Sequence, residues 1–91
     1  MPAKARVHER VHEKHTEISE QDVMAAWENL FRWSLRETER KDYYVAVGMD
    51  QKGRLLEMVA AVEEDGTMVI FHAMTPPSKK TLREVGLTRE R

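Results

Sequence analysis

Four histidines are the side chains best suited to proton transfer or metal binding in this sequence, and three of them lie close together. His8, His12 and His15 are separated by four and then three residues, so a helix would place them on one strip of its surface. Neutral imidazoles with this spacing bind zinc in some proteins, but the chain has no cysteine and the spacing is common by chance. We therefore predict partly exposed histidines here, with no metal ion and no other cofactor.

His15 and His72 are the candidates for acid–base chemistry. His15 ends the first expected helix, where it would either exchange protons or interact with the negative end of the helix dipole. By simple alternation, His72 shares a strand face with Met68 and Ile70. A histidine with apolar strand neighbours is more often a hydrogen-bonded core or sheet-edge residue than a catalytic one. Its position at the end of a strand, where loops meet, leaves the catalytic role open.

Lys79 and Lys80 follow Ser78, a suitable N-cap for a short last helix. Lysines in the first turn of a helix lie against the positive end of its dipole, which costs roughly a few tenths of a kcal/mol each. An anion-binding role would explain this choice, because the backbone N–H groups after Ser78 and the two ammonium groups form a cradle for a phosphate. The alternative is a basic tail that tolerates lysine at any position.

Trp33, Arg54 and Glu57 interrupt the expected apolar patterns. Trp33 is displaced from the apolar face of its expected helix; packing under another element is the simplest explanation, and stacking on a base or anchoring a protein partner is the next. Glu57 breaks the apolar run of a strand that begins at Arg54. We expect Glu57 to pair with a basic side chain, because a buried carboxylate needs a partner.

Two helices are expected in the first half of the chain. Over residues 3–14, Val7 and Val11 lie four residues apart, as on one helix face. A second helix is expected over residues 20–36, because Ser19 is a natural N-cap and the apolar side chains that follow repeat with helical spacing. The polar residues 37–41 are expected to form a linker.

The second half alternates with a period of two, which indicates strands. They are expected over residues 43–48, 54–63 and 67–74. Turns at Gly53 and Gly66 separate them, and a short helix follows Ser78 and ends at Gly86. The predicted fold is therefore an α+β domain with two N-terminal helices, a three-stranded antiparallel meander and a short C-terminal helix.

The composition fits a single domain over residues 1–91. Hydrophobic residues make up 41% and charged residues 34%, which is enough apolar content for a small core. With 91 residues, large barrels, solenoids and two-domain enzymes are excluded. No apolar stretch is long enough to cross a membrane and none resembles a secretory signal, so we expect a cytoplasmic protein that does not bind membranes. The net charge of −1 hides basic segments at residues 1–15 and 75–91, which would form a phosphate-binding patch if they met.

Several short motifs resemble the BrnT group of small bacterial toxins, which belongs to the RelE-like ribonuclease superfamily. Lys14-His15 precedes a capped helix, Arg54 enters a central strand, and Ala73 lies at the end of the last strand, as in BrnT-like chains. The resemblance covers roughly residues 11–85. It implies a compact α+β toxin that is produced beside a neutralising antitoxin and cleaves RNA.

The resemblance further implies a metal-independent ribonuclease in which the RNA 2′-hydroxyl attacks the adjacent phosphate. His15 and His72 would exchange protons, and the scissile phosphate would bind the side chains of Arg54, Lys79 and Lys80. Further RNA contacts would come from Lys14, Arg83 and Trp33.

The alternative is a non-enzymatic protein-interaction module or an inactive relative of these toxins. Met74 stands where BrnT-like chains carry an arginine, which favours the inactive relative. A homodimer through a strand edge or the second helix belongs to the same class of function.

Overall fold

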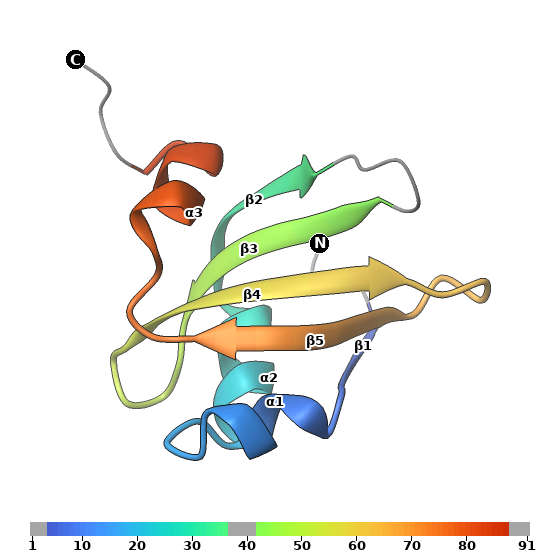
Figure 1. Ribbon diagram of the computed structural model, residues 1–91, viewed down its shortest axis with the longest axis horizontal. Helices are drawn as coiled ribbons and strands as arrows, with labels where there is room; N and C mark the ends of the chain where they lie inside the picture. The colour runs from blue at the N-terminus through green and yellow to red at the C-terminus, as the bar shows by residue number, and fades with distance from the viewer. Residues whose placement is uncertain (1–3, 37–41, 88–91) are drawn as a thin grey trace.

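The computed structural model describes residues 4–36 and 42–87, and its strands form one five-stranded mixed sheet (Figure 1). The strand order is β1-β5-β4-β3-β2. In chain order the elements are β1 (Ala5–Val7), α1 (Arg10–Lys14), α2 (Glu20–Glu28), β2 (Leu30–Arg36), β3 (Tyr43–Met49), β4 (Leu55–Val62), β5 (Met68–Met74) and α3 (Lys79–Glu84).

β1 is short, and this leaves part of β5 beside a helix. β1 runs parallel to β5 and pairs Ala5–Val7 with residues 68–70, whereas the other neighbouring strands are antiparallel. The pairing ends where the His8 N–H donates to the Ile70 carbonyl at 2.8 Å. α1 then packs along the remaining half of β5, so this edge is bordered by a helix.

α1 and α2 cover one face of the sheet and bury the main core (Figure 1). Ser19 starts α2 with a capping box, because its hydroxyl accepts the Asp22 N–H at 3.1 Å and the Asp22 carboxylate accepts the Ser19 N–H at 2.9 Å. The helix lies so close to β3 that a Cβ atom at Gly48 would be 2.0 Å from the Ala26 carbonyl oxygen. The packing of α2 on the sheet therefore depends on a glycine at position 48.

α3 lies against the opposite face. Val85 packs there with Val45, Val47 and Val59, and the rings of Tyr43 and Phe71 lie against this smaller cluster. None of the helices in the described residues is long and apolar enough to span a membrane.

The prediction of two N-terminal helices is wrong. Residues 5–7 form β1, because their backbone groups complete the edge of β5 while Ala5 and Val7 pack against the main core. Only Arg10–Lys14 are helical in this segment, and α2 ends at Glu28. The apolar side chains of Leu30–Arg36 fit a strand alternation as well as a helical spacing. Hydrogen bonds to β3 make this segment a strand.

The predicted three-stranded meander is also wrong, because the sheet has five strands. The three expected strands correspond to β3, β4 and β5, but β2 adds to β3 and β1 adds to β5. Over the described residues the fold is thus α+β, with three helices and a mixed sheet. The expected linker over residues 37–41 lies outside the described residues.

Candidate active site

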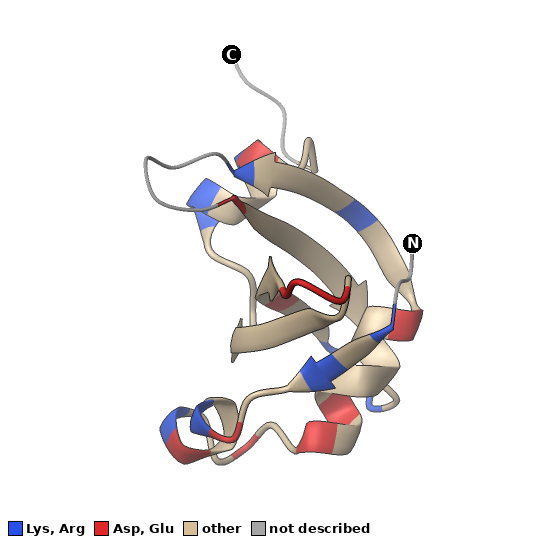
Figure 2. Cartoon of the chain, turned by 90° about the vertical axis from the view of Figure 1, so that its right-hand side faces the viewer, with Lys and Arg blue, Asp and Glu red and all other residues tan. Residues whose placement is uncertain are grey.

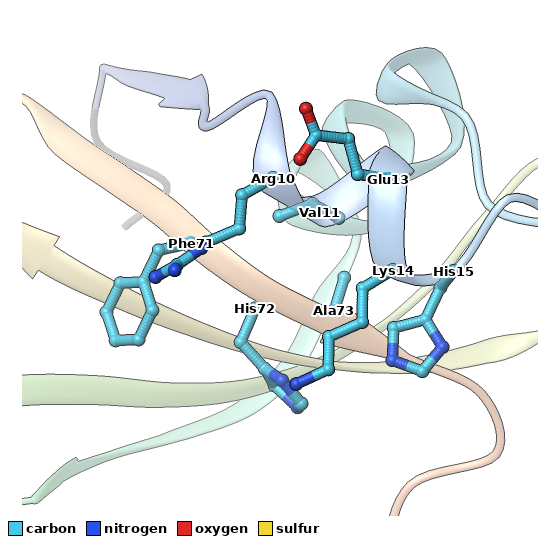
Figure 3. Close-up of a pocket in the computed structure, with 8 residues that line it drawn as sticks. All are labelled: Arg10, Val11, Glu13, Lys14, His15, Phe71, His72 and Ala73. Carbon is cyan, nitrogen blue, oxygen red and sulfur yellow. The ribbon is translucent and has the colours of Figure 1, made fainter.

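A cavity of about 600 Å³ lies where α1 borders the edge of β5 (Figure 3). It is lined by Arg10, Val11, Glu13, Lys14, His15, Phe71, His72 and Ala73. The two candidate acid–base histidines, which are far apart in the sequence, therefore meet in one cavity. Lys14, expected from the sequence to contact RNA, lies beside them.

The imidazole rings of His15 and His72 meet edge to face, with their centres 6.4 Å apart. Both side chains remain partly accessible, at 29% for His15 and 31% for His72. Figure 3 shows both rings and the Lys14 side chain at the same opening. Two imidazoles this close are able to serve the same small substrate group, one accepting a proton and the other donating one.

A bulge in β5 brings His72 to this position. Val59 and Ala60 of β4 pair with His72 and Ile70, so Phe71 is the extra residue of the bulge. The bulge reverses the alternation after Ile70, and His72 shares a sheet face with Val59. The prediction that His72 lies on the face of Ile70 is therefore wrong.

Glu57 fixes the orientation of the His72 ring. The Nε2–H of His72 donates to one carboxylate oxygen at 2.8 Å, and Ser78 donates to the other through its backbone N–H and its hydroxyl, each at 2.9 Å. His72 is thus the basic partner that Glu57 was expected to have. With Nε2 as the donor, Nδ1 of the neutral ring is the nitrogen that can accept a proton.

The Glu57 carboxylate remains ionised although it is buried. Burial raises the pKa of Glu57, but hydrogen bonds from Ser78, Thr81 and His72 together outweigh burial and hold this pKa below 4.5. A carboxylate that is charged at neutral pH keeps accepting the Nε2–H of His72, so it keeps the ring in one tautomer.

The same carboxylate occupies the N-terminus of α3. The Ser78 hydroxyl accepts the Thr81 N–H at 3.2 Å, while the Ser78 N–H donates to Glu57. The expected phosphate cradle at Ser78 therefore already holds an internal carboxylate. Lys79 and Lys80 are exposed on α3, and Lys80 lines a second cavity.

This second cavity, of about 450 Å³, lies between α3 and the sheet and shares Phe71 and His72 with the first. Its other lining residues are Arg36, Tyr43, Glu57, Val59, Ser78, Lys80 and Thr81. The rings of Tyr43 and Phe71 pack edge to face with centres 5.3 Å apart. We call the two cavities together the β5 groove, because His72 and Phe71 line both of them.

Basic side chains flank the β5 groove from elements on both sides of the sheet. Arg10 and Lys14 of α1 line the first cavity, whereas Arg36 and Lys80 line the second. Figure 2 shows Lys and Arg on α1 and α3, which lie on opposite sides of the sheet. The basic segments near the two ends of the chain therefore border the same groove.

Arg54 lies in another part of the molecule, where it ties the β3–β4 turn to the start of α2. Its guanidinium donates to Asp50 at 2.8 Å, to Asp22 at 3.0 Å and to the Glu17 carbonyl at 3.1 Å. The hydrogen bond from the Ser19 N–H is the main cause that holds the pKa of Asp22 below 3.8. Arg54 lines neither cavity of the β5 groove, and its contacts here stabilise the fold.

Trp33 and Arg83 also lie outside the residues that line the groove. Trp33 is on β2 and pairs with Ala46 of β3. Its ring centre lies 5.5 Å from that of Tyr44. Ala46 belongs to the main core and Tyr44 packs against it, so Trp33 is on the α2 side of the sheet. Its side chain is half exposed. Arg83 is exposed on α3.

Residues His8 to His12 have the HExxH spacing, which forms a zinc site when both histidines project from one helix. Here α1 begins only at Arg10, after the first histidine. The His8 Nδ1 accepts the Arg10 N–H at 3.1 Å, and the His12 Nδ1 donates to the Ile18 carbonyl at 3.1 Å. Across residues 4–36 and 42–87, no three His, Cys, Asp or Glu side chains are grouped to hold a metal ion.

Arg10 and Phe71 are groove residues that the sequence did not single out. Arg10 precedes Lys14 by four residues, so the helical spacing of the basic pair was an available signal. Phe71 had no such signal, because the bulge that turns it toward the groove depends on the pairing of β5 with β4.

Comparison with known proteins gives no relatives for this arrangement. No protein-family model matches the chain, and no curated protein and no solved structure matches it.

Proposed function

We propose that the protein is a metal-independent ribonuclease that cleaves RNA by attack of the 2′-hydroxyl on the adjacent phosphate. The observation that carries this proposal is the His15–His72 pair, with ring centres 6.4 Å apart in a cavity that Lys14 also lines. The resemblance of the sequence to BrnT-like toxins favours the same reaction.

The reaction requires two proton transfers and no redox chemistry. A base takes the proton of the 2′-hydroxyl while its oxygen bonds to phosphorus, and the bond from phosphorus to the 5′-oxygen breaks. An acid gives its proton to that departing oxygen. The products are a 2′,3′-cyclic phosphate and a 5′-hydroxyl, so all atoms are accounted for without water.

His72 is the proposed base and His15 the proposed acid. The Nδ1 of His72 is available to accept a proton because its Nε2–H donates to Glu57. The His15 ring faces the His72 ring across the same cavity, with their centres 6.4 Å apart, so it can donate a proton to the departing oxygen while His72 accepts one. Lys14 and Arg10 supply positive charge for the phosphate, whose charge increases in the transition state.

RNA cleavage in the presence of EDTA tests this proposal. The wild-type protein should cut RNA, naked or ribosome-bound, to cyclic-phosphate products and leave the 2′-deoxy analogue intact. Lys14→Ala should lower kcat/KM by about 10-fold or more, which corresponds to one charge-assisted phosphate contact of roughly 1.5–3 kcal/mol. Lys4→Ala is the matched control, because Lys4 is an exposed lysine that does not line the groove. Absence of cleavage by a folded wild-type protein contradicts the proposal.

A toxin role would add two further features to this proposal. The partner would be a neutralising antitoxin that covers the β5 groove, and the location would be the cytoplasm, where the RNA substrates are. Co-expression with a candidate antitoxin should suppress both RNA cleavage and growth inhibition.

A protein-interaction module is the second candidate function, and the exposed apolar side of β2 favours it. Trp33 and Leu35 are 49% and 43% exposed on an edge strand of the sheet. A homodimer through this strand would give a concentration-dependent mass in sedimentation, and Trp33→Lys would abolish it. A monomer at all concentrations contradicts the homodimer.

A further inference from the structure

We propose that the second cavity of the β5 groove binds a nucleobase next to the scissile phosphate, so that the substrate is single-stranded RNA. This inference rests on the proposed ribonuclease function and assigns the substrate class of that site. Phe71 and His72 line both cavities, so the second cavity is adjacent to the proposed base of the reaction, His72.

Charge distinguishes the two cavities. In the first, Arg10 and Lys14 face a single carboxylate, Glu13, which leaves a positive surplus for a phosphate. In the second, Arg36 donates to Glu84 at 3.0 Å, and the buried Glu57 carboxylate forms part of the wall. Glu84 also interacts electrostatically with Lys80, the other cation of this cavity. The second cavity therefore has no surplus of positive charge like that of the first, and it suits an uncharged group.

Aromatic rings give the second cavity the character of a base site. The rings of Phe71 and Tyr43 pack edge to face with their centres 5.3 Å apart, and both residues line the cavity. A base that stacks on one of these rings would find a polar partner in Lys80 on the α3 side. The volume, about 450 Å³, is in the range of small-ligand sites.

The geometry selects single strands over duplexes. A base inside a duplex is stacked and paired, so it would have to leave the helix before it entered this cavity. A base of a single strand only has to rotate away from its neighbours. Because stacking on an aromatic ring is open to every base, the site should show little preference among the four bases.

A binding experiment with a 2′-O-methyl oligonucleotide tests the inference without cleavage. One nucleotide at a time is replaced by an abasic residue, and the affinity is measured for the wild-type protein, for Phe71→Leu and for Phe31→Leu. Phe31 is the control because it is an exposed phenylalanine outside the groove. At one position the abasic residue should weaken wild-type and Phe31→Leu binding by about 5-fold to 100-fold, and the loss should disappear in Phe71→Leu.

Two results overturn the inference. One is that no abasic position weakens the affinity of the wild-type protein. This result does not depend on the folding of any variant. The other is an equal abasic loss in wild type and in a folded Phe71→Leu. Both are distinct from failure of the proposed reaction, which is lack of cleavage of unmodified RNA by a protein that still binds the 2′-O-methyl strand.

Discussion

His72 acts together with Glu57, and this pair connects the interior of the molecule to its groove. Glu57 is the buried middle member of a hydrogen-bonded group, because its carboxylate accepts from Ser78 on one side and from the Nε2–H of His72 on the other. The exposed end of the group is the His72 ring edge in the first cavity. In the proposed reaction, a carboxylate in this position would be a positioning residue, because it would act on the substrate only through the imidazole.

Glu57→Gln should therefore slow RNA cleavage by at least about 10-fold, up to the roughly 10²–10⁴-fold expected when proton transfer is lost. An amide cannot accept from His72 and Ser78 at both ends at once, so the ring loses its fixed tautomer. The pH–rate profile of RNA cleavage should also change shape. Glu63→Gln, at an exposed ion pair with Arg6, is the control. An unaltered profile and rate in folded Glu57→Gln would rule out the positioning role.

Asp22 illustrates a stability effect at the scale of one residue. Its carboxylate accepts hydrogen bonds from the Ser19 N–H, Lys52 and Arg54, and its pKa is below 3.8, with the Ser19 N–H as the main cause. Because the folded state has the lower pKa, this contribution to the free energy of unfolding is fully present above pH 3.8. It is lost as the pH falls below that value and the carboxylate takes up a proton.

Asp22→Asn should lower the free energy of unfolding by about 1.5–3 kcal/mol at neutral pH, which is typical of hydrogen bonds to a charged group. The difference from wild type should shrink below about pH 3.8, since the wild-type carboxylate is then losing its charge. Urea unfolding at neutral pH and below about pH 3.8 measures this difference in the free energy of unfolding. Glu28→Gln, at an exposed carboxylate of α2, should change little at either pH. An equal difference at neutral and acid pH would contradict the ionic origin of the effect.

At the scale of elements, Gly48 sets how closely α2 approaches the sheet. Gly48→Ala should destabilise the fold by about 1–3 kcal/mol or more, because the new Cβ would lie 2.0 Å from the Ala26 carbonyl oxygen and backbone must move. Thermal or urea unfolding would show the loss. Gly53→Ala is not a suitable control, because the positive φ of Gly53 strains any substitution there. Ala61→Gly in β4 is a suitable control, because it measures the stability cost of a glycine within a strand. Wild-type stability in Gly48→Ala would mean that α2 packs less closely.

The sequence predicted the elements whose local signals agree with their pairing. β3, β4 and β5 alternate and are separated by Gly53 and Gly66, both of which have positive φ in the structure. Ser19 and Ser78 cap α2 and α3 as expected. For these segments the local and the tertiary preferences are the same.

The segments that were predicted wrongly owe their structure to strand pairing, which local patterns do not determine. Residues 30–36 satisfy a helical spacing and a strand alternation, and only hydrogen bonds to β3 decide between them. Residues 5–7 form a strand because β5 offers an edge, which no local signal reveals. In the same way, the sequence identifies His15 and His72 as acid–base candidates but not their proximity. The bulge at Phe71 that lets the two rings meet depends on the pairing of β5 with β4.

At the scale of the whole molecule, the candidate site depends on β1 being short. Because the β1–β5 pairing stops at Ile70, α1 borders the rest of β5 and presents Lys14 and His15 to it. α3 approaches from the other side of the sheet and contributes Ser78 and Lys80. Thus the two basic ends of a chain with a net charge of −1 produce a local surface suited to a polyanion.

The pH dependence of RNA cleavage by the wild-type protein, His15→Gln and His72→Gln tests the central claim most directly. Histidine changes its charge between about pH 5 and 8, so a pair of one neutral base and one protonated acid gives a bell-shaped rate profile in this range. We predict this bell for the wild type, with EDTA present. Each variant should lose about 10²–10⁴-fold in rate and one limb of the bell. Cleavage with a flat profile, or both folded variants at the wild-type rate, would contradict the account.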